Sequence, residues 1–236
     1  MIPKKIHYCW FGRGPLPPMA EKCIASWRKF CPDYEIVQWN EDNFDLDANG
    51  YTRWCHDHKK WAFLSDYVRL AVILDQGGIY FDTDVELLKP LDALMEQEAF
   101  YGFENATVVN TGQGFGAEAG HVTVAAMAEQ YLQLKPDAQG DYSLTPCPAL
   151  NTAALVPMGL RLDGCRQRVA GAEILPVDYL NPYDEPKGTL NKTENTISIH
   201  WYGKSWISPG RRLRSKLTRP FHRLFGTDCF RWLKRK

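Results

Sequence analysis

The sequence predicts an α/β protein in which one mixed sheet is flanked by helices, followed by a basic helical tail. Three observations predict this class. Residues 4–40 have the order strand, helix, strand, which favours a parallel pair of strands. Residues 59–76 form a long, mostly apolar helical pattern that leads directly into an apolar strand. Residues 211–236 contain ten Lys or Arg and one Asp, so this tail carries +9 while the rest of the chain carries −9.

The first half of the chain contains the clearest elements. A strand over 4–12 enters a loop rich in glycine and proline, a helix over 19–31 ends at Pro32-Asp33, and a second strand covers 34–40. The helix over 59–76 ends at Gly77-Gly78, where a left-handed C-cap favours glycine. An apolar strand then continues through residue 88.

The second half predicts shorter elements. Strands are expected over 99–105 and 108–117, the latter leading into a glycine-rich loop, and helices over 121–134 and 149–156. Two further short strands are expected over 173–177 and 196–201. The glycine-rich loop lacks the Gly-x-Gly-x-x-Gly spacing of a dinucleotide site.

Composition sets the domain count and the compartment. Of 236 residues, 44% are hydrophobic and 24% are charged, as in an ordinary soluble domain. We expect one domain over 1–208 and the tail over 209–236. The seven cysteines form no Cys-x-x-Cys pair, and there is no apolar signal region and no run of membrane-spanning length. A reducing cytoplasm, without zinc site or disulfide framework, is the expected setting.

Two aspartates lie inside the apolar stretch "GGIYFDTDVELL" at residues 77–88. In a continuous strand Tyr80, Asp82, Asp84 and Glu86 share one face, so both carboxylates project together. Two like charges at that spacing need a cation, and an oxygen pair suits a hard ion such as Mg²⁺ or Mn²⁺, whose open positions a diphosphate fills. The alternative is that both are turn formers at an exposed strand end.

Three further sites carry candidate binding residues. Asp66 and Arg69 lie three apart in "FLSDYVRL", where they form either a structural ion pair or an acceptor and a donor for sugar hydroxyls. In "SIHWYGKSW", His200 is a candidate metal ligand or a core histidine, and Lys204 a candidate diphosphate contact. Asn110 ends its strand either as a ligand contact or as a turn former.

Together, "IPKKIHYCWFG", "WAFLSDYVRLAVILDQGGIYFDTDVELLKPLD", "VVNTGQGFGA" and "IHWYGKSW" resemble the DXD-containing glycosyltransferases. This group includes capsular-polysaccharide sugar transferases, fungal initiating mannosyltransferases and large clostridial cytotoxins. The resemblance runs from Ile2 to Trp206. It implies a GT-A type, Rossmann-like fold, a nucleotide-diphosphate sugar donor, Mn²⁺ or Mg²⁺, and retention of anomeric configuration.

The resemblance also implies roles for particular residues. Asp66 and Arg69 would hold the donor sugar, and Asp82 would meet both ribose and metal. The other nucleotide-sugar contacts implied are Trp10 on the base, Tyr80, Asn110, Lys204, Ser205 and Trp206. Asp84 would bind the metal, and either His200 or Ser205 would complete its shell. We expect Asp66, Arg69, Asp82 and Asp84 to be the catalytic group.

The expected function is transfer of a hexose, with UDP-hexose favoured, to a hydroxyl of a glycan or lipid-linked oligosaccharide in capsular or surface polysaccharide synthesis. No side chain stands out as a covalent nucleophile, so a front-face substitution is the hypothesis for retention. One rival is a haloacid dehalogenase-like phosphatase with Asp82 as nucleophile. The other is a non-catalytic carbohydrate-binding module.

Apolar residues recur at helical spacing among the arginines of the tail, although Pro220 interrupts the pattern. That composition is typical of a helix lying on an anionic membrane surface. We therefore expect a peripheral position at the inner membrane face and no nucleic-acid partner.

Overall fold

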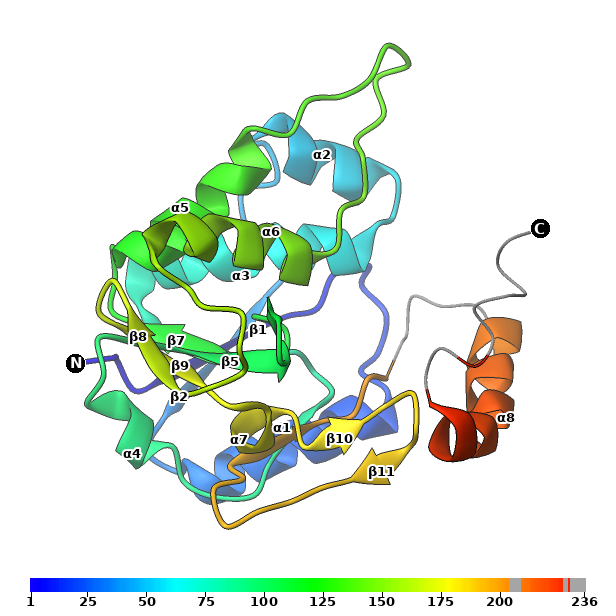
Figure 1. Ribbon diagram of the computed structural model, residues 1–236. Coiled ribbons are helices and arrows are strands. Elements are labelled where there is room, and N and C mark those ends of the chain that lie inside the picture. The colour runs from blue at the N-terminus through cyan, green and yellow to red at the C-terminus, as the bar shows by residue number, and fades with distance from the viewer. Residues whose placement is uncertain (204–208, 227–228, 230–236) are drawn as a thin grey trace.

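The computed structural model describes residues 1–203, 209–226 and 229. A twisted mixed sheet forms the middle layer, with helices on both faces (Figure 1). Its strands lie in the order β2-β1-β3-β7-β5-β9-β8, with β6 paired to β5. The bounds are β1 Lys5–Cys9, β2 Glu35–Trp39, β3 Gly78–Tyr80, β5 Ala99–Asn105, β6 Val108–Val109, β7 Phe115–Ala117, β8 Gln167–Val169 and β9 Ala172–Leu175.

The sheet is mixed because its two halves join through antiparallel β7. β1 pairs in parallel with β2 and with β3, as the strand, helix, strand order predicted. β7 runs antiparallel to both β3 and β5, and β5 pairs in parallel with β9. The DXD strand β3 is therefore central, with a neighbour on each side.

Two apolar cores lie on the two faces of the sheet. One lies under α2 Gly50–Asp57, α3 Trp61–Gln76, α5 Val122–Leu132 and α6 Cys147–Leu155. The other lies under α1 Pro18–Phe30, α4 Asp92–Met95 and α7 Val177–Leu180. Figure 1 shows these two helical layers above and below the strands. The three-layer α/β class is confirmed.

The turn from α3 into β3 is fixed by glycine and by a buried histidine. Gly77 ends α3 with φ +66, the left-handed region that the sequence predicted, and its N–H bonds to Ile73 O at 2.9 Å. His7 Nε2 lies 3.0 Å from Gly77 O, and His7 Nδ1 accepts from Trp39 Nε1 at 3.0 Å. Burial lowers the pKa of His7 to about 4, so this neutral ring holds the start of β3 against β1.

The remaining elements lie at the C-terminal side of the fold. They are β4 Val85–Leu87, the 3-10 turn η1 Val156–Met158, the hairpin β10 Tyr183–Asp184 with β11 Thr189–Leu190, β12 Ser198–His200 and α8 Pro209–Phe225. The short helix α2, strand β8 and the hairpin were not predicted, because their patterns are brief. Among the described helices, none combines the length and the apolar character that a bilayer crossing requires.

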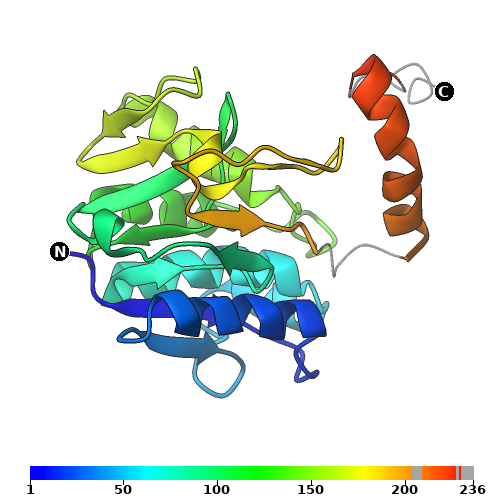
Figure 2. The ribbon, with the colours of Figure 1, turned by 90° about the horizontal axis from the view of Figure 1, so that it is seen from below.

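Helix α8 stands beside the body rather than within it (Figure 2). Arg219 contacts Glu185 at 3.4 Å, and Arg223 donates to the carbonyls of Lys187 and Gly188 at 2.7 and 3.0 Å. These contacts attach it to the β10–β11 hairpin.

Candidate active site

The DXD segment is not the continuous strand that the sequence predicted. β3 ends at Tyr80, and the chain turns through residues 82–84, where Val85 N–H bonds to Asp82 O at 3.0 Å. β4 then pairs antiparallel with β12 instead of extending β3. The prediction of one strand through residue 88 was wrong, because the hydrogen bond from Phe81 N–H to His7 O is the last that β1 offers along this edge. The turn lifts both aspartates out of the sheet at its carboxyl edge.

Helix α3 delivers Asp66 and Arg69 to the same edge. Both are buried, with relative exposures of 8% and 2%, although α3 is otherwise largely apolar. Arg69 Nη2 lies 3.0 Å from Asp66 Oδ1 and 2.9 Å from Asp82 Oδ1. One guanidinium nitrogen thus joins the helix pair to the DXD turn, so the predicted pair is part of a larger charged cluster.

Asp82 is held in a fixed orientation. The hydroxyl of Tyr80 donates to Asp82 Oδ1 at 3.0 Å, and the Arg69 guanidinium lies 4.9 Å from the centre of the Tyr80 ring. Burial raises the pKa of Asp82, and the positive charge of Arg69 offsets part of that rise. These bonds all involve Oδ1, which leaves Oδ2 to meet a ligand.

Asp84 and His200 form the second half of the charged cluster. His200 Nε2 lies 3.3 Å from Asp84 Oδ1, and Gly203 N–H donates to Asp84 Oδ2 at 2.6 Å. Burial alone would raise the pKa of Asp84, but His200 and Gly203 outweigh it and lower that pKa. Burial alone would lower the pKa of His200, but Asp84 outweighs it and raises that pKa.

One ligand atom from each of Asp82, Asp84 and His200 lies within 4.8 Å of the other two. Two carboxylates and an imidazole are a suitable donor set for Mn²⁺, and the carboxylates also suit Mg²⁺. The residues present therefore fit the predicted metal. Ser205, the alternative third ligand, lies outside the described residues, as do the predicted contacts Lys204 and Trp206.

The glycine-rich loop closes the site beside the DXD turn. Asn110 is buried, its Oδ1 accepts from Gly112 N–H at 2.7 Å, and its Nδ2 donates to Glu104 at 3.2 Å. A Cβ on Gly112 would come within 2.5 Å of Asp82 Oδ2. The bond from Gly112 N–H to Asn110 Oδ1 is the one that the turn-forming alternative predicts, and Gly112 permits the close approach of this loop to Asp82. The contact of Asn110 with a ligand stays a prediction.

Trp10 lies at the end of β1, half-buried, in the loop before α1. Its backbone N–H bonds to Trp39 O at 2.8 Å, and its indole N–H donates to Gly14 O at 2.7 Å. The ring is thereby fixed against the glycine and proline loop. Its predicted contact with a nucleotide base stays a prediction.

Sequence reasoning missed several residues at this site. Glu104, at the end of β5, accepts from Asn110 and from the hydroxyl of Tyr202 at 3.2 Å. The Tyr202 ring centre lies 4.1 Å from that of His200, and Asn181 donates to the Tyr202 hydroxyl at 2.7 Å. An acid at the end of a predicted strand was the available signal for Glu104. Tyr202 and Asn181 had no signal in their spacing.

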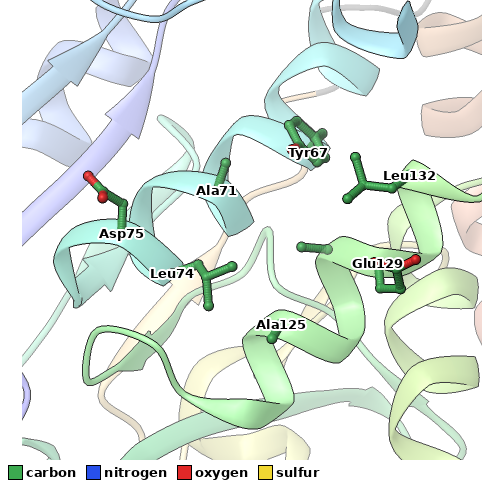
Figure 3. A pocket seen from close by; sticks show the side chains of 8 residues that line it. Tyr67, Ala71, Leu74, Asp75, Ala125, Glu129 and Leu132 are labelled. Atoms are coloured by element: carbon green, nitrogen blue, oxygen red, sulfur yellow. The ribbon is translucent and has the colours of Figure 1, made fainter. Parts of the chain in front are cut away.

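A groove of about 480 Å³ between α3 and α5 is separate from this cluster. Tyr67, Ala71 and Leu74 line it from α3, and Ala125, Glu129 and Leu132 from α5 (Figure 3). At 3.6 residues per turn these α3 positions face away from Asp66 and Arg69. The charged cluster, and not this groove, is the candidate active site.

Comparison with known proteins supports this assignment. Residues 17–101 match the family model of the glycosyltransferase sugar-binding region containing DXD motif. That segment includes Asp66, Arg69, Asp82 and Asp84. The resemblance to DXD-containing glycosyltransferases is thus confirmed over this segment.

Two curated relatives match this chain over only part of their own length. Inositol phosphoceramide mannosyltransferase 3 of Schizosaccharomyces pombe is 31% identical over 107 residues, 42% of this chain and 29% of that protein. Subversion of eukaryotic traffic protein A of Legionella pneumophila is 24% identical over 111 residues, 36% of this chain and 17% of that protein. The chain spans less than a third of either relative's length.

The solved structure of PaToxG glycosyltransferase superposes with a TM-score of 0.52 at 16% identity. The superposition covers 66% of this chain and 69% of that chain. It shows a shared fold, and the predicted GT-A type is confirmed.

Proposed function

From the premise that this chain carries the DXD-containing sugar-binding region of a glycosyltransferase, we propose that it transfers a hexose from a nucleotide-diphosphate sugar to an acceptor hydroxyl. The observation that carries the proposal is the convergence of Asp66, Arg69, Asp82, Asp84 and His200 from separate elements at one edge of the sheet. Asp66 and Arg69 are buried, and the side chains of Asp82 and Asp84 are 29% and 21% exposed. Desolvation offsets much of the attraction within such a cluster, so the cluster contributes little to stability by itself. A ligand that uses these charges explains its presence.

Asp82, Asp84 and His200 would hold the divalent ion, Mn²⁺ or Mg²⁺. When bound, such an ion neutralises the charge that develops on a departing diphosphate. The ion pair of His200 and Asp84 is compatible with this role, because a bound metal would take the place of a proton on the imidazole. Lys204 would contact the diphosphate, as its residue type and motif predict.

Asp66 and Arg69 would orient the sugar, because one supplies acceptor oxygens and the other supplies N–H donors. Arg69 is fixed by two carboxylates and by the Tyr80 ring, so little freedom is lost when the donor binds. The hydroxyl of Tyr80 keeps Asp82 aligned beneath the nucleotide. These are positioning roles that leave the anomeric carbon open to the acceptor.

For the chemical step we propose front-face substitution with retention. The acceptor oxygen bonds to the anomeric carbon, the bond to the diphosphate oxygen breaks with its electron pair, and the departing phosphate takes the acceptor's proton. Trapping a glycosyl-enzyme adduct on a carboxylate of the site would overturn this step. UDP-hexose is the proposed donor, and a glycan or lipid-linked acceptor in surface polysaccharide synthesis is the proposed setting.

The test is binding and turnover of a panel of nucleotide sugars with Mn²⁺ or with EDTA. We expect metal-dependent binding of one donor by calorimetry, and slow hydrolysis of that donor. Asp84→Ala should lower the turnover at least about 100-fold, as loss of an electrostatic contact to the transition state does. Asp75→Ala, which removes an exposed carboxylate on the far side of α3, is the matched control.

Two outcomes would contradict the proposal. Folded protein that binds no nucleotide sugar would favour the carbohydrate-binding module. Release of phosphate from simple esters would favour the phosphatase, although Asp82 Oδ1 is already engaged by Arg69 and Tyr80.

We further propose that α8 contacts an anionic membrane surface. Leu217, Leu224 and Phe225 are 66%, 78% and 70% exposed on a helix whose sequence is strongly basic. Each basic residue near such a surface contributes about 1 kcal/mol. The chain should float with vesicles that contain phosphatidylserine, less so as salt rises, and not with vesicles of phosphatidylcholine alone. Equal flotation with both, at all salt concentrations, would contradict an anionic surface.

A further inference from the structure

Helix α6 contributes to the charged cluster although no part of it was predicted to do so. Cys147 is its first residue, directly after Pro146, and Asn151 follows one turn later on the same face. Arg69 Nη1 donates to Cys147 Sγ at 3.4 Å, and the thiol lies 3.6 Å from Asn110 Oδ1. Asn151 Nδ2 donates to Thr111 Oγ1 at 2.9 Å. The beginning of α6 therefore touches both the arginine and the glycine-rich loop that hold the site.

Around this contact, several buried polar atoms have no partner within the described part of the chain. They include Nε of Arg69 and Oδ1 of Asn151, whose residues are 2% and 0% exposed. The hydroxyls of Tyr51 and Tyr131 are also without partners there. Buried polar groups are ordinarily paired, so a cluster of unpaired ones next to Asp66 indicates a hydroxylated ligand or ordered water.

We infer that Cys147 forms the wall against which the donor hexose lies, with the fully buried Asn151 supporting the loop behind it, and that the thiol of Cys147 limits which hexose fits. This inference rests on the proposed function and assigns a specificity role that the DXD motif does not carry. A thiol is a weak donor and a weak acceptor. The sugar hydroxyls therefore bond to the stronger groups of Asp66, Arg69 and Asn110. The volume of the thiol limits the space that is available to the hexose ring.

The environment of the thiol excludes a role as nucleophile. Burial raises the pKa of Cys147 well above its ordinary value, and the negative charge of Asp66 raises it further. The thiolate is the reactive form of cysteine, so this neutral thiol acts as a surface in contact with the sugar.

The test compares binding of the sugar nucleotide with binding of the nucleoside diphosphate that lacks the sugar. Cys147→Val adds bulk at the wall. It should leave the calorimetric affinity for UDP unchanged and weaken the affinity for the UDP-hexose at least about tenfold, the usual effect of one excess methyl group in a fitted pocket. Cys55→Val, at a fully buried cysteine of α2 in the same core, controls for the strain of added volume. Cys147→Ala should change the order of preference among UDP-glucose, UDP-galactose and UDP-N-acetylglucosamine.

Equal affinities of the wild type and Cys147→Val for the UDP-hexose, or an equal fall for UDP and UDP-hexose, would overturn the inference. Where the valine variant does not fold, Cys147→Ala gives the answer, because it removes volume from the wall instead of adding it. Its affinity for UDP should equal that of the wild type while its order of preference among the three sugar nucleotides differs; an unchanged order would overturn the inference. A wild type that binds UDP but no sugar nucleotide would refute the proposed function itself.

Discussion

At the scale of single residues, Asp66 is a candidate sugar contact whose acidity is altered by burial. Burial raises its pKa to about 6 from an ordinary 3.8, with Arg69 offsetting part of the rise. The folded protein therefore holds this proton more tightly than the unfolded chain does. The contribution of Asp66 to the free energy of unfolding falls as the pH rises from 3.8 to about 6 and is level above that.

Asp66→Asn removes that titration. In EDTA, the stability of the variant relative to the wild type should increase by about 2 kcal/mol between pH 4 and pH 7, measured by chemical unfolding. Donor affinity of the wild type should rise over the same window, because the carboxylate accepts hydrogen bonds from sugar hydroxyls only when ionised. Parallel stability profiles of the two proteins would show that Asp66 does not carry this proton.

The residues that the sequence predicted at this scale have strong local signals. Asp82, Asp84, Asp66 and Arg69 are charges within apolar runs, and such charges demand a partner. His200 was predicted as a metal ligand from its residue type and from the position of its motif in the sequence. Cys147 could not be predicted, because an ordinary cysteine between two prolines becomes part of the site only when α6 folds onto Arg69.

At the scale of elements, the loop between β6 and β7 controls how closely the site can pack. A Cβ on Gly112 would lie 2.5 Å from Asp82 Oδ2, 3.1 Å from Asn110 Oδ1 and 3.2 Å from Arg69 Nη1. Asn110 Oδ1 and Arg69 Nη1 are held by other bonds. Asp82 Oδ2 belongs to a carboxylate whose other oxygen is held by Arg69 and Tyr80, so the three atoms cannot all withdraw. The glycine is needed there for space.

Gly112→Ala should therefore displace Asp82 while the sheet stays folded. We expect transfer to fall at least about 100-fold, because misplacement of about 1 Å has that effect on an ordered reaction. Gly14→Ala is the matched control, since nothing lies within 4 Å of its added methyl group. Turnover of the donor and thermal melting are the measurements. Normal turnover in Gly112→Ala would contradict the tight packing of this loop.

Elements with a long apolar periodicity were predicted correctly. Elements whose bounds depend on which strands pair with each other were not. The helix over 59–76 was predicted because its apolar pattern runs over four turns and ends at two glycines. The apolar stretch over 77–88 gave no sign of its break, because β3 and β4 are both strands with similar composition. Only their pairing partners differ, because β3 pairs with β1 and β7 whereas β4 pairs with β12.

At the scale of the whole molecule, the body and the tail differ in how they are held. The buried apolar residues of both cores all lie within residues 1–203. The contacts of α8 with the body include the ion pair of Arg219 with Glu185, the Arg219 guanidinium 5.9 Å from the centre of the Tyr183 ring, and hydrogen bonds from Arg223 to the hairpin. The tail and the body have opposite net charges in the sequence, and the ion pair between Arg219 and Glu185 is a contact between these charges.

A chain that ends at residue 208 should therefore fold and bind the donor like the full chain. The ion pair, whose side chains are 26% and 11% exposed, and the two hydrogen bonds of Arg223 contribute about 1 kcal/mol each. We therefore expect the loss of these contacts to lower the free energy of unfolding by about 3 kcal/mol. Chemical unfolding measures the first quantity and calorimetry with the nucleotide sugar and Mn²⁺ the second, with Arg219→Gln in the full chain as the variant that removes only the ion pair. Loss of cooperative unfolding in the shortened chain would show instead that α8 completes the fold. Weaker donor binding with unchanged stability would place α8 at the donor site, as an element that closes on the nucleotide sugar.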